Sequence, residues 1–153
     1  MVVDTIICAT KGSEGCKLAE DKAIEIAKDN NSKLVFLYVI NIKFMEKGVG
    51  GGEWAEDDVV SGLKNIGGVI LDIAKEKAVE KGVPAENVSK EERRGDIASE
   101  IKSSVEEHNA DLVIIGHPRT DTGFLERYLI KKEGHERFVQ RLKEKIGTKV
   151  MIV

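Results

Sequence analysis

The chain has 153 residues, of which 41% are hydrophobic and 33% are charged, and its formal net charge is -3 at pH 7. This length suits one domain over residues 1–153, with room for a core between a sheet and its covering helices. The small negative charge gives no clustered positive field for nucleic acid, and nothing in the composition requires a membrane, so we expect neither as a partner.

A short apolar run opens the chain and breaks into a small, polar turn before a helix. The run is Thr5–Ala9, and Ser13 in the turn is a candidate cap for the helix that follows. Small and apolar residues then recur at three- and four-residue steps, which places them on one face of a helix. These residues are Cys16, Ala19, Ala23, Ile26 and Ala27.

The start of the chain and its two cysteines bear on the cellular compartment. No basic start or long apolar stretch precedes the first strand, so we expect no secretion signal and a cytoplasmic protein. Cys8 and Cys16 do not form a C-x-x-C pair. We expect both to be reduced thiols in or near the core.

The second predicted strand, Leu34–Ile40, is too continuously apolar for a strand with one wet face. We expect it to be central and covered on both sides. A connection over Asn41–Trp54 follows, with four glycines between positions 48 and 52. We interpret it as a mobile loop. The alternative, a phosphate-binding loop, is disfavoured because the glycines do not lead directly from a strand into a helix.

A long amphipathic helix is predicted from Val59 to Lys81, ended by Gly82 and Pro84. Gly67 and Gly68 weaken its middle, because each costs up to about 1 kcal/mol relative to alanine. We therefore expect close packing or a bend at this point. The next segment, Val88–Arg94, is strongly charged and, if it is a strand, must lie at an edge of the sheet.

The rest of the chain repeats the alternation of helix and strand. Gly95-Asp96 predicts a turn and a cap for a helix that ends near His108, and Leu112–Ile115 predicts a strand that stops at Gly116. A last helix carries Phe138, Leu142 and Ile146, and Val150–Val153 forms a final strand. Strands joined through helices predict a five-stranded parallel α/β sheet. Where the first strand lies beside a partner such as Leu112–Ile115, with diverging connections, a ligand crevice forms.

Four segments resemble the universal stress protein family: Ile6–Gly15, Leu37–Val39, Gly95–Ile101 and Ala110–Gly116. The resemblance covers essentially the whole chain. It implies an open Rossmann-like α/β sheet of order 3-2-1-4-5 with helices on both faces, and a role in stress response. It also implies homodimers that pair through the final strand and, in one branch of the family, ATP held at the ends of the first and fourth strands.

The resemblance also implies which residues would touch a ligand. They are Ala9, Thr10, Lys11, Val39, Gly116, Arg119, Gly134 and His135. The nucleotide-binding branch carries G-x-x-G, nine residues, and then Gly followed by Ser or Thr. Gly116 matches the first glycine, but Arg119 replaces the second, and Gly134-His135 comes late and lacks the hydroxyl. Lys11 stands where the family has an acidic residue.

These departures alter the chemistry of the crevice. A lysine at position 11 cannot accept a hydrogen bond from a nucleoside, and Arg119 brings bulk and five donors in place of a glycine. These changes speak against the family's usual ATP pose, but with His135 the two residues would suit an anion, so the candidate ligands are ATP or AMP held differently, or another anionic molecule. Alternatively, Lys11 is a solvated turn residue and Arg119 belongs to a surface ion-pair set.

No nucleophile with a partnered base is recognisable in the sequence, so we expect a binding or signalling module without dedicated catalysis. The enzymatic alternative is ATP hydrolysis or nucleotidyl or phosphoryl transfer, with Lys11, Arg119 and His135 stabilising charge. A third alternative is a dimer that acts through protein contacts alone. His117 and His135 have no third ligand at metal-binding spacing, so no metal is expected. Thr120–Glu133 predicts an extra helical turn, packed on the domain or serving as a lid or docking surface.

Overall fold

The computed structural model describes residues 3–11, 14–40, 53–116 and 140–153 of the chain. The strands are β1 (Thr5–Ala9), β2 (Lys33–Ile40), β3 (Val88–Arg94), β4 (Leu112–Ile115) and β5 (Lys149–Ile152). The helices are α1 (Glu14–Asn30), α3 (Glu53–Glu80) and α4 (Ile97–His108), with a short 3-10 turn, η1, at Ala85–Asn87. Residues 140–146 are also helical.

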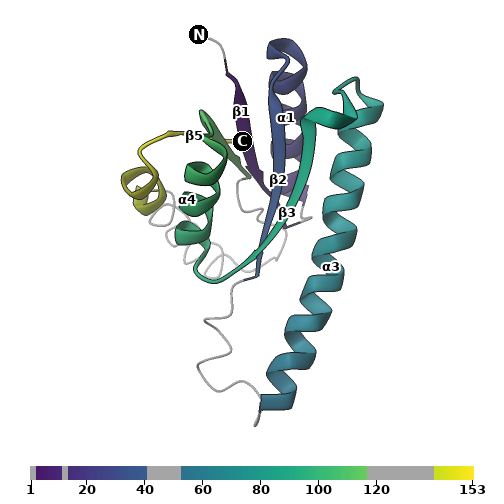
Figure 1. Ribbon diagram of the computed structural model, residues 1–153, viewed down its shortest axis with the longest axis vertical. Coiled ribbons are helices and arrows are strands. Elements are labelled where there is room, and N and C mark those ends of the chain that lie inside the picture. Colours follow the sequence, from purple (N-terminus) through teal and green to yellow (C-terminus); the bar gives the residue numbers. More distant parts are fainter. Residues whose placement is uncertain (1–2, 12–13, 41–52, 117–139) are drawn as a thin grey trace, which may run out of the picture.

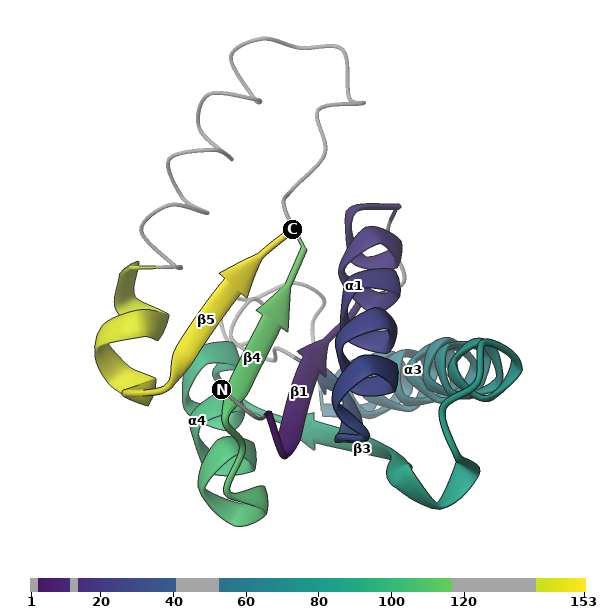
Figure 2. The ribbon, with the colours of Figure 1, turned by 90° about the horizontal axis from the view of Figure 1, so that it is seen from above.

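The five strands form one parallel sheet in the order β3-β2-β1-β4-β5. Helices α1 and α3 cover one face, and α4 with the helix of residues 140–146 covers the other (Figures 1 and 2). The N-terminal half of α3 extends beyond the sheet (Figure 1). The α/β class, the parallel strands and the 3-2-1-4-5 order are therefore confirmed.

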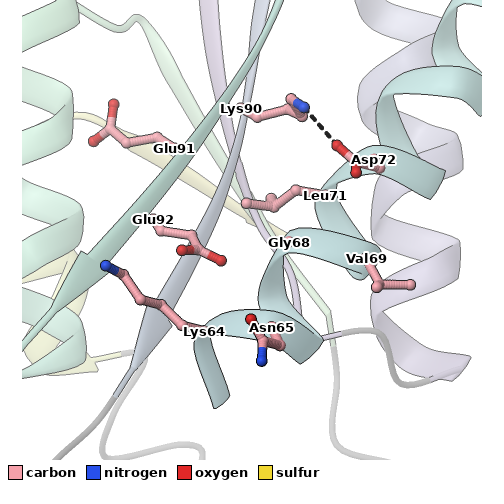
Figure 3. A pocket seen from close by; sticks show the side chains of 9 residues that line it. All are labelled: Lys64, Asn65, Gly68, Val69, Leu71, Asp72, Lys90, Glu91 and Glu92. Atoms are coloured by element: carbon pink, nitrogen blue, oxygen red, sulfur yellow. Dashed lines mark hydrogen bonds and ion pairs between the residues drawn. The ribbon is translucent and has the colours of Figure 1, made fainter. Parts of the chain in front are cut away.

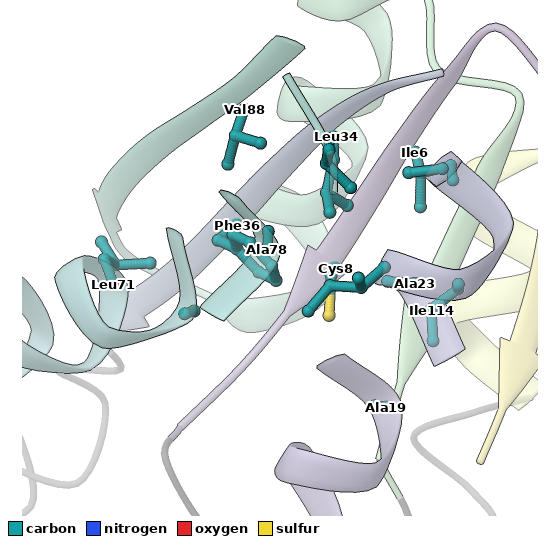
Figure 4. Close-up of a cluster of buried hydrophobic side chains, with 14 of the residues drawn as sticks. Ile6, Cys8, Ala19, Ala23, Leu34, Phe36, Leu71, Ala78, Val88 and Ile114 are labelled. Carbon is teal, nitrogen blue, oxygen red and sulfur yellow. The ribbon is translucent and has the colours of Figure 1, made fainter. Parts of the chain in front are cut away.

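Two apolar cores lie on opposite faces of the sheet, because alternate residues of each strand point to opposite sides. Leu34 and Phe36 of β2 belong to the core beneath α1 and α3, which Figure 4 shows. Val35 and Leu37 belong to the core beneath α4. This double burial confirms the interpretation of the continuously apolar segment as a central strand.

Small residues let α1 lie close to the sheet. Ala19, Ala23 and Ala27 are almost fully buried and face the strands. The larger side chains of this core, among them Phe36 and Ile114, come from the strands (Figure 4). The spacing of apolar residues in α1 therefore predicted most of its buried face, although Ile26 is only partly buried and the fully buried Ile24 was not predicted.

The ends of the helices follow their capping residues. The carboxylate of Asp96 accepts the backbone N–H of Ser99 at 3.1 Å, so the expected cap of α4 is confirmed. Asn109 ends that helix in the left-handed conformation, with φ 51°. Gly147, with φ 68°, follows the helix of residues 140–146. The predicted Ser13 cap lies outside the described residues.

One predicted boundary is wrong. The connection expected over Asn41–Trp54 stops earlier, because α3 begins at Glu53, well before the expected start at Val59. The apolar periodicity used for the prediction begins only at Val59, so it did not reveal the first turns of the helix. The glycine cluster of positions 48–52, expected to be mobile, lies outside the described residues.

The two edge strands differ in character. β3 is charged, and it pairs with β2 along its whole length at the edge of the sheet. An edge strand can carry such charged residues when they find partners. β5 is apolar and begins at Lys149, one residue before the expected start. Val153 lies just past the strand, but its N–H still donates to the carbonyl of Ile115 at 3.0 Å.

Candidate crevice at the ends of β1 and β4

The carboxyl ends of β1 and β4 lie side by side at the centre of the sheet. Ala9 is in register with Ile115, and the next residues of the two strands are Thr10 and Gly116. The chain leaves β1 for α1 on one face, whereas the helix of residues 140–146 after β4 packs on the other face (Figure 2). Such a divergence is where open α/β sheets bind ligands.

The corner after β1 is held by three hydrogen bonds to two different elements. The N–H of Thr10 donates to the carbonyl of Leu37 in β2 at 2.9 Å. Its hydroxyl donates to Glu20 Oε2 at 2.6 Å. The N–H of Lys11 points to Cys16 Sγ at 3.3 Å. Because its amide is taken by this sulfur, Lys11 offers the crevice its exposed side chain rather than its backbone donor.

The structure brings part of the predicted site together. Ala9, Thr10 and Lys11 follow one another at the end of β1, and Gly116 follows β4 beside them. Val39 lies on the neighbouring strand two residues beyond Leu37, the register partner of Ala9. The other predicted residues, Arg119, Gly134 and His135, lie outside the described residues. So do His117 and the helical turn expected over Thr120–Glu133.

Glu20 is a buried residue at this corner that the sequence analysis missed. Only 4% of it is exposed, and its carboxylate joins Thr10 to Lys77 of α3, whose Nζ lies 3.1 Å from Glu20 Oε1. A signal was present in the sequence, because Glu20 falls four residues after Cys16 and three before Ala23, on the buried face of α1. A charged residue in that position needs a partner.

The charge on Lys77 is favoured by its neighbours. Burial works against the ammonium group, but hydrogen bonds to Asp21 and Glu20, with their negative charges, outweigh it and raise the pKa of Lys77. Asp21 pairs with Lys77 and also with Lys81, whose Nζ lies 3.2 Å from Asp21 Oδ1. Two carboxylates and two ammonium groups therefore balance one another between α1 and the end of α3.

The two cysteines are free and buried, as expected. Burial, with a smaller effect of the Glu20 charge, raises the pKa of the Cys8 thiol well above its usual range. A thiol that stays protonated and inaccessible is a poor nucleophile. Cys8 therefore acts as a core residue, next to Ala19 and Ala23 of α1 (Figure 4).

A hollow lies between α3 and β3, away from the candidate crevice. It has a volume of about 550 Å³ and is lined by Lys64, Gly68, Lys90 and Glu92, among others (Figure 3). Lys90 forms an ion pair with Asp72 across it. Within the described residues, Glu92 Oε1 is buried and has no hydrogen-bond partner. The mixed charges of this hollow favour no single class of ligand.

Neither a metal site nor a membrane span is found in the described parts of the chain. They hold no group of three His, Cys, Asp or Glu side chains arranged around a metal position. No helix among them is long and apolar enough to cross a bilayer.

Comparison with known proteins identifies the family. A model of the Universal stress protein family matches residues 3–132. The chain is 31% identical over 116 residues to Universal stress protein YxiE of Bacillus subtilis (strain 168), a match covering 72% of this chain and 76% of that protein.

Solved structures share the fold at low identity. One is a universal stress protein in complex with cAMP, with TM-score 0.64 and 18% identity over 100% of this chain and 98% of the other. Another is a universal stress protein family protein from Arabidopsis thaliana with AMP bound, with TM-score 0.60 and 17% identity over 98% and 90% of the two chains.

Proposed function

Because this chain belongs to the universal stress protein family, we propose that it is a dimeric binding module of stress signalling that takes a nucleotide or another anionic ligand. The observation that carries the proposal is the register of Ala9 with Ile115, which sets the corners after β1 and β4 beside each other. Relatives of the same fold have cAMP or AMP bound, which supports a nucleotide as the ligand class.

The proposed contacts follow from what each corner offers. Lys11 presents an exposed ammonium group, which suits a phosphate and cannot accept a hydrogen bond from a ribose hydroxyl. Gly116 allows a ligand close to the backbone after β4. Ala9, Thr10 and Val39 would form the floor, and Arg119, Gly134 and His135 remain predicted ligand contacts. ATP and AMP are the first candidates.

The proposed dimer pairs through β5. This apolar strand is the outermost strand of the described sheet, next to β4. An edge strand presents backbone N–H and C=O groups that a second copy can pair with. The buried, unoxidised Cys8 and Cys16 suit a reducing compartment such as the cytoplasm, where we place the protein.

Mass spectrometry of the purified protein tests both halves of the proposal. Under native conditions we expect twice the subunit mass plus the mass of one adenine nucleotide per subunit, and the added mass should disappear on denaturation. Lys11→Ala should lose the nucleotide, whereas Lys17→Ala, at an exposed position of α1, should keep it. If the protein carries no nucleotide and takes up neither ATP nor AMP when these are added, the proposal of a nucleotide ligand is refuted.

The same preparation separates binding from catalysis. Incubation with ATP and magnesium, followed by chromatography, should return the nucleotide unchanged. Rapid formation of product that Lys11→Ala abolishes would instead support the enzymatic alternative.

A further inference from the structure

Glu20 stands out among the polar residues of the chain because it is buried and spans three elements. Its Oε2 accepts the hydroxyl of Thr10 at 2.6 Å, at the end of β1, and its Oε1 lies 3.1 Å from Lys77 Nζ in α3. The residue itself belongs to α1 and is 4% exposed. A series of polar contacts thus connects the crevice corner, through Glu20 of α1, to α3, a helix that contributes none of the predicted ligand contacts.

The ionised carboxylate fixes the orientation of Thr10. A carboxylate can only accept hydrogen bonds, so the hydroxyl of Thr10 must be the donor. The N–H of Thr10 is already used by the carbonyl of Leu37 at 2.9 Å. The side chain of Thr10 is therefore held by α1 and its backbone by β2, which fixes where the chain turns toward Lys11.

Glu20 needs a cation beside it because it is buried. An unpaired buried carboxylate is strongly destabilised, whereas a paired one has its charge balanced. Among the described residues, the charged and titratable groups around Glu20 are Lys77 from α3, Asp21 from its own helix, Lys81 beyond Asp21, and the neutral thiol of Cys8 from β1. Of these, Lys77 alone is a cation in direct contact with the carboxylate.

We propose that Glu20 is a positioning residue of the crevice and that Lys77 holds its carboxylate in place, so that binding of an anionic ligand depends on an ion pair that does not touch the ligand. This inference rests on the function proposed above. It also explains how a carboxylate can lie at an anion-binding corner, because Lys77 balances the negative charge.

The test compares AMP affinity, by calorimetry, and stability, by denaturant unfolding, among variants. Lys77→Met removes the cation and keeps the length of the side chain. Glu20→Gln with Lys77→Met leaves a neutral pair in which the amide oxygen can still accept the Thr10 hydroxyl. Lys81→Met is the matched control, because Lys81 pairs with Asp21 and not with Glu20.

We expect Lys77→Met to weaken AMP binding about 2- to 30-fold near neutral pH. The double variant should bind within about threefold of wild type, because its neutral pair can still accept the Thr10 hydroxyl, and Lys81→Met should bind like wild type.

Loss of packing alone would weaken binding equally in Lys77→Met and in the double variant, and this result would overturn the proposal. Unchanged affinity in Lys77→Met would overturn it as well. If wild type binds no AMP, the proposed function fails, and the amide resonances of Thr10 and Lys11 then decide the inference. They should move away from their wild-type positions in Lys77→Met and return toward them in the double variant; resonances that match wild type in Lys77→Met would refute the positioning role.

Discussion

Gly67 of α3 lies against the ring of Tyr38 in β2, so close that a Cβ built on the glycine would be 2.4 Å from Tyr38 Cδ1. The same Cβ would lie 2.8 Å from Glu92 Oε1. Two adjacent glycines in a helix are unfavourable by themselves, and the sequence led us to expect close packing or a bend as compensation. Close packing is found at Gly67. It brings α3 close to the Tyr38 ring of β2.

Gly67→Ala should therefore destabilise the protein. Alanine is the better helix former by about 1 kcal/mol, but a methyl group here must displace the Tyr38 ring, and overpacking costs about 1–3 kcal/mol. We expect a net loss of up to about 2 kcal/mol in the free energy of unfolding, measured with urea. Gly62→Ala is the control, because nothing lies within 4 Å of its Cβ, and it should be stabilising. Equal effects at both positions would contradict the packing account.

The cap of α4 provides a second prediction. Asp96 accepts both the N–H and the hydroxyl of Ser99, at 3.1 and 2.9 Å. Asp96→Ala should lower the free energy of unfolding by about 1 kcal/mol, because it leaves an N–H of the first turn unpaired. Asp96→Asn keeps an acceptor oxygen and should remain close to wild type. If the two variants were equally unstable, the capping bond would not be the cause.

Glu91 makes stability depend on pH. Burial favours its neutral form, but hydrogen bonds and positive charge from His108 and Arg93 outweigh burial and lower the pKa of Glu91 below its usual range. A lowered folded-state pKa means that the stabilisation is present above the pKa of the unfolded chain, about 4.3, and is lost as pH falls through the folded-state value.

Glu91→Gln should lower the free energy of unfolding by about 1–2 kcal/mol at pH 7, because the Glu91 side chain is only 17% exposed and its hydrogen bonds involve charge. Its stability should also fall less steeply than that of wild type between about pH 5 and about pH 3. Glu106→Gln is the control, since Glu106 is 69% exposed and lies 3.9 Å from Lys102. Parallel pH curves for wild type and Glu91→Gln would disprove this role.

The dimer proposed at β5 can be tested without breaking the sheet. Val153 donates its N–H to the carbonyl of Ile115 in β4. Because backbone N–H groups alternate in direction along a strand, the N–H of Met151 also points to β4, whereas those of Val150 and Ile152 point to the open edge. Val150→Pro removes an edge donor and should convert the dimer to a folded monomer in sedimentation velocity. Met151→Pro removes a bond to β4 and should destabilise the fold. A Val150→Pro protein that sediments as wild type would exclude pairing through this edge.

Local patterns predicted the elements of the fold well, because each strand and helix shows its own periodicity. Leu112–Ile115 was predicted to the residue, and the charged segment Val88–Arg94 was correctly expected at an edge. The partners of those charges could not be predicted. Arg93 pairs with Glu107, and Lys90 pairs with Asp72, across distances in sequence that no local pattern reports.

The sequence indicated which corners of the chain meet at the candidate site better than it indicated the chemistry of those corners. The adjacency of the corners at Lys11 and Gly116 follows from strand order, which the resemblance supplied. Glu20 and Lys77 form an ion pair although they lie far apart in the sequence, in α1 and α3. The sequence shows that Glu20 falls on the apolar face of α1, but only the folded structure shows which residue is its partner.

The most direct test of the crevice is an NMR titration of the isotope-labelled protein with AMP, in which each backbone amide is followed. We predict saturable shifts at residues 9–11 and Gly116, at the ends of β1 and β4. Shifts confined to Gly68 and Glu92, in the hollow between α3 and β3, or no shifts at saturating AMP, would contradict the account.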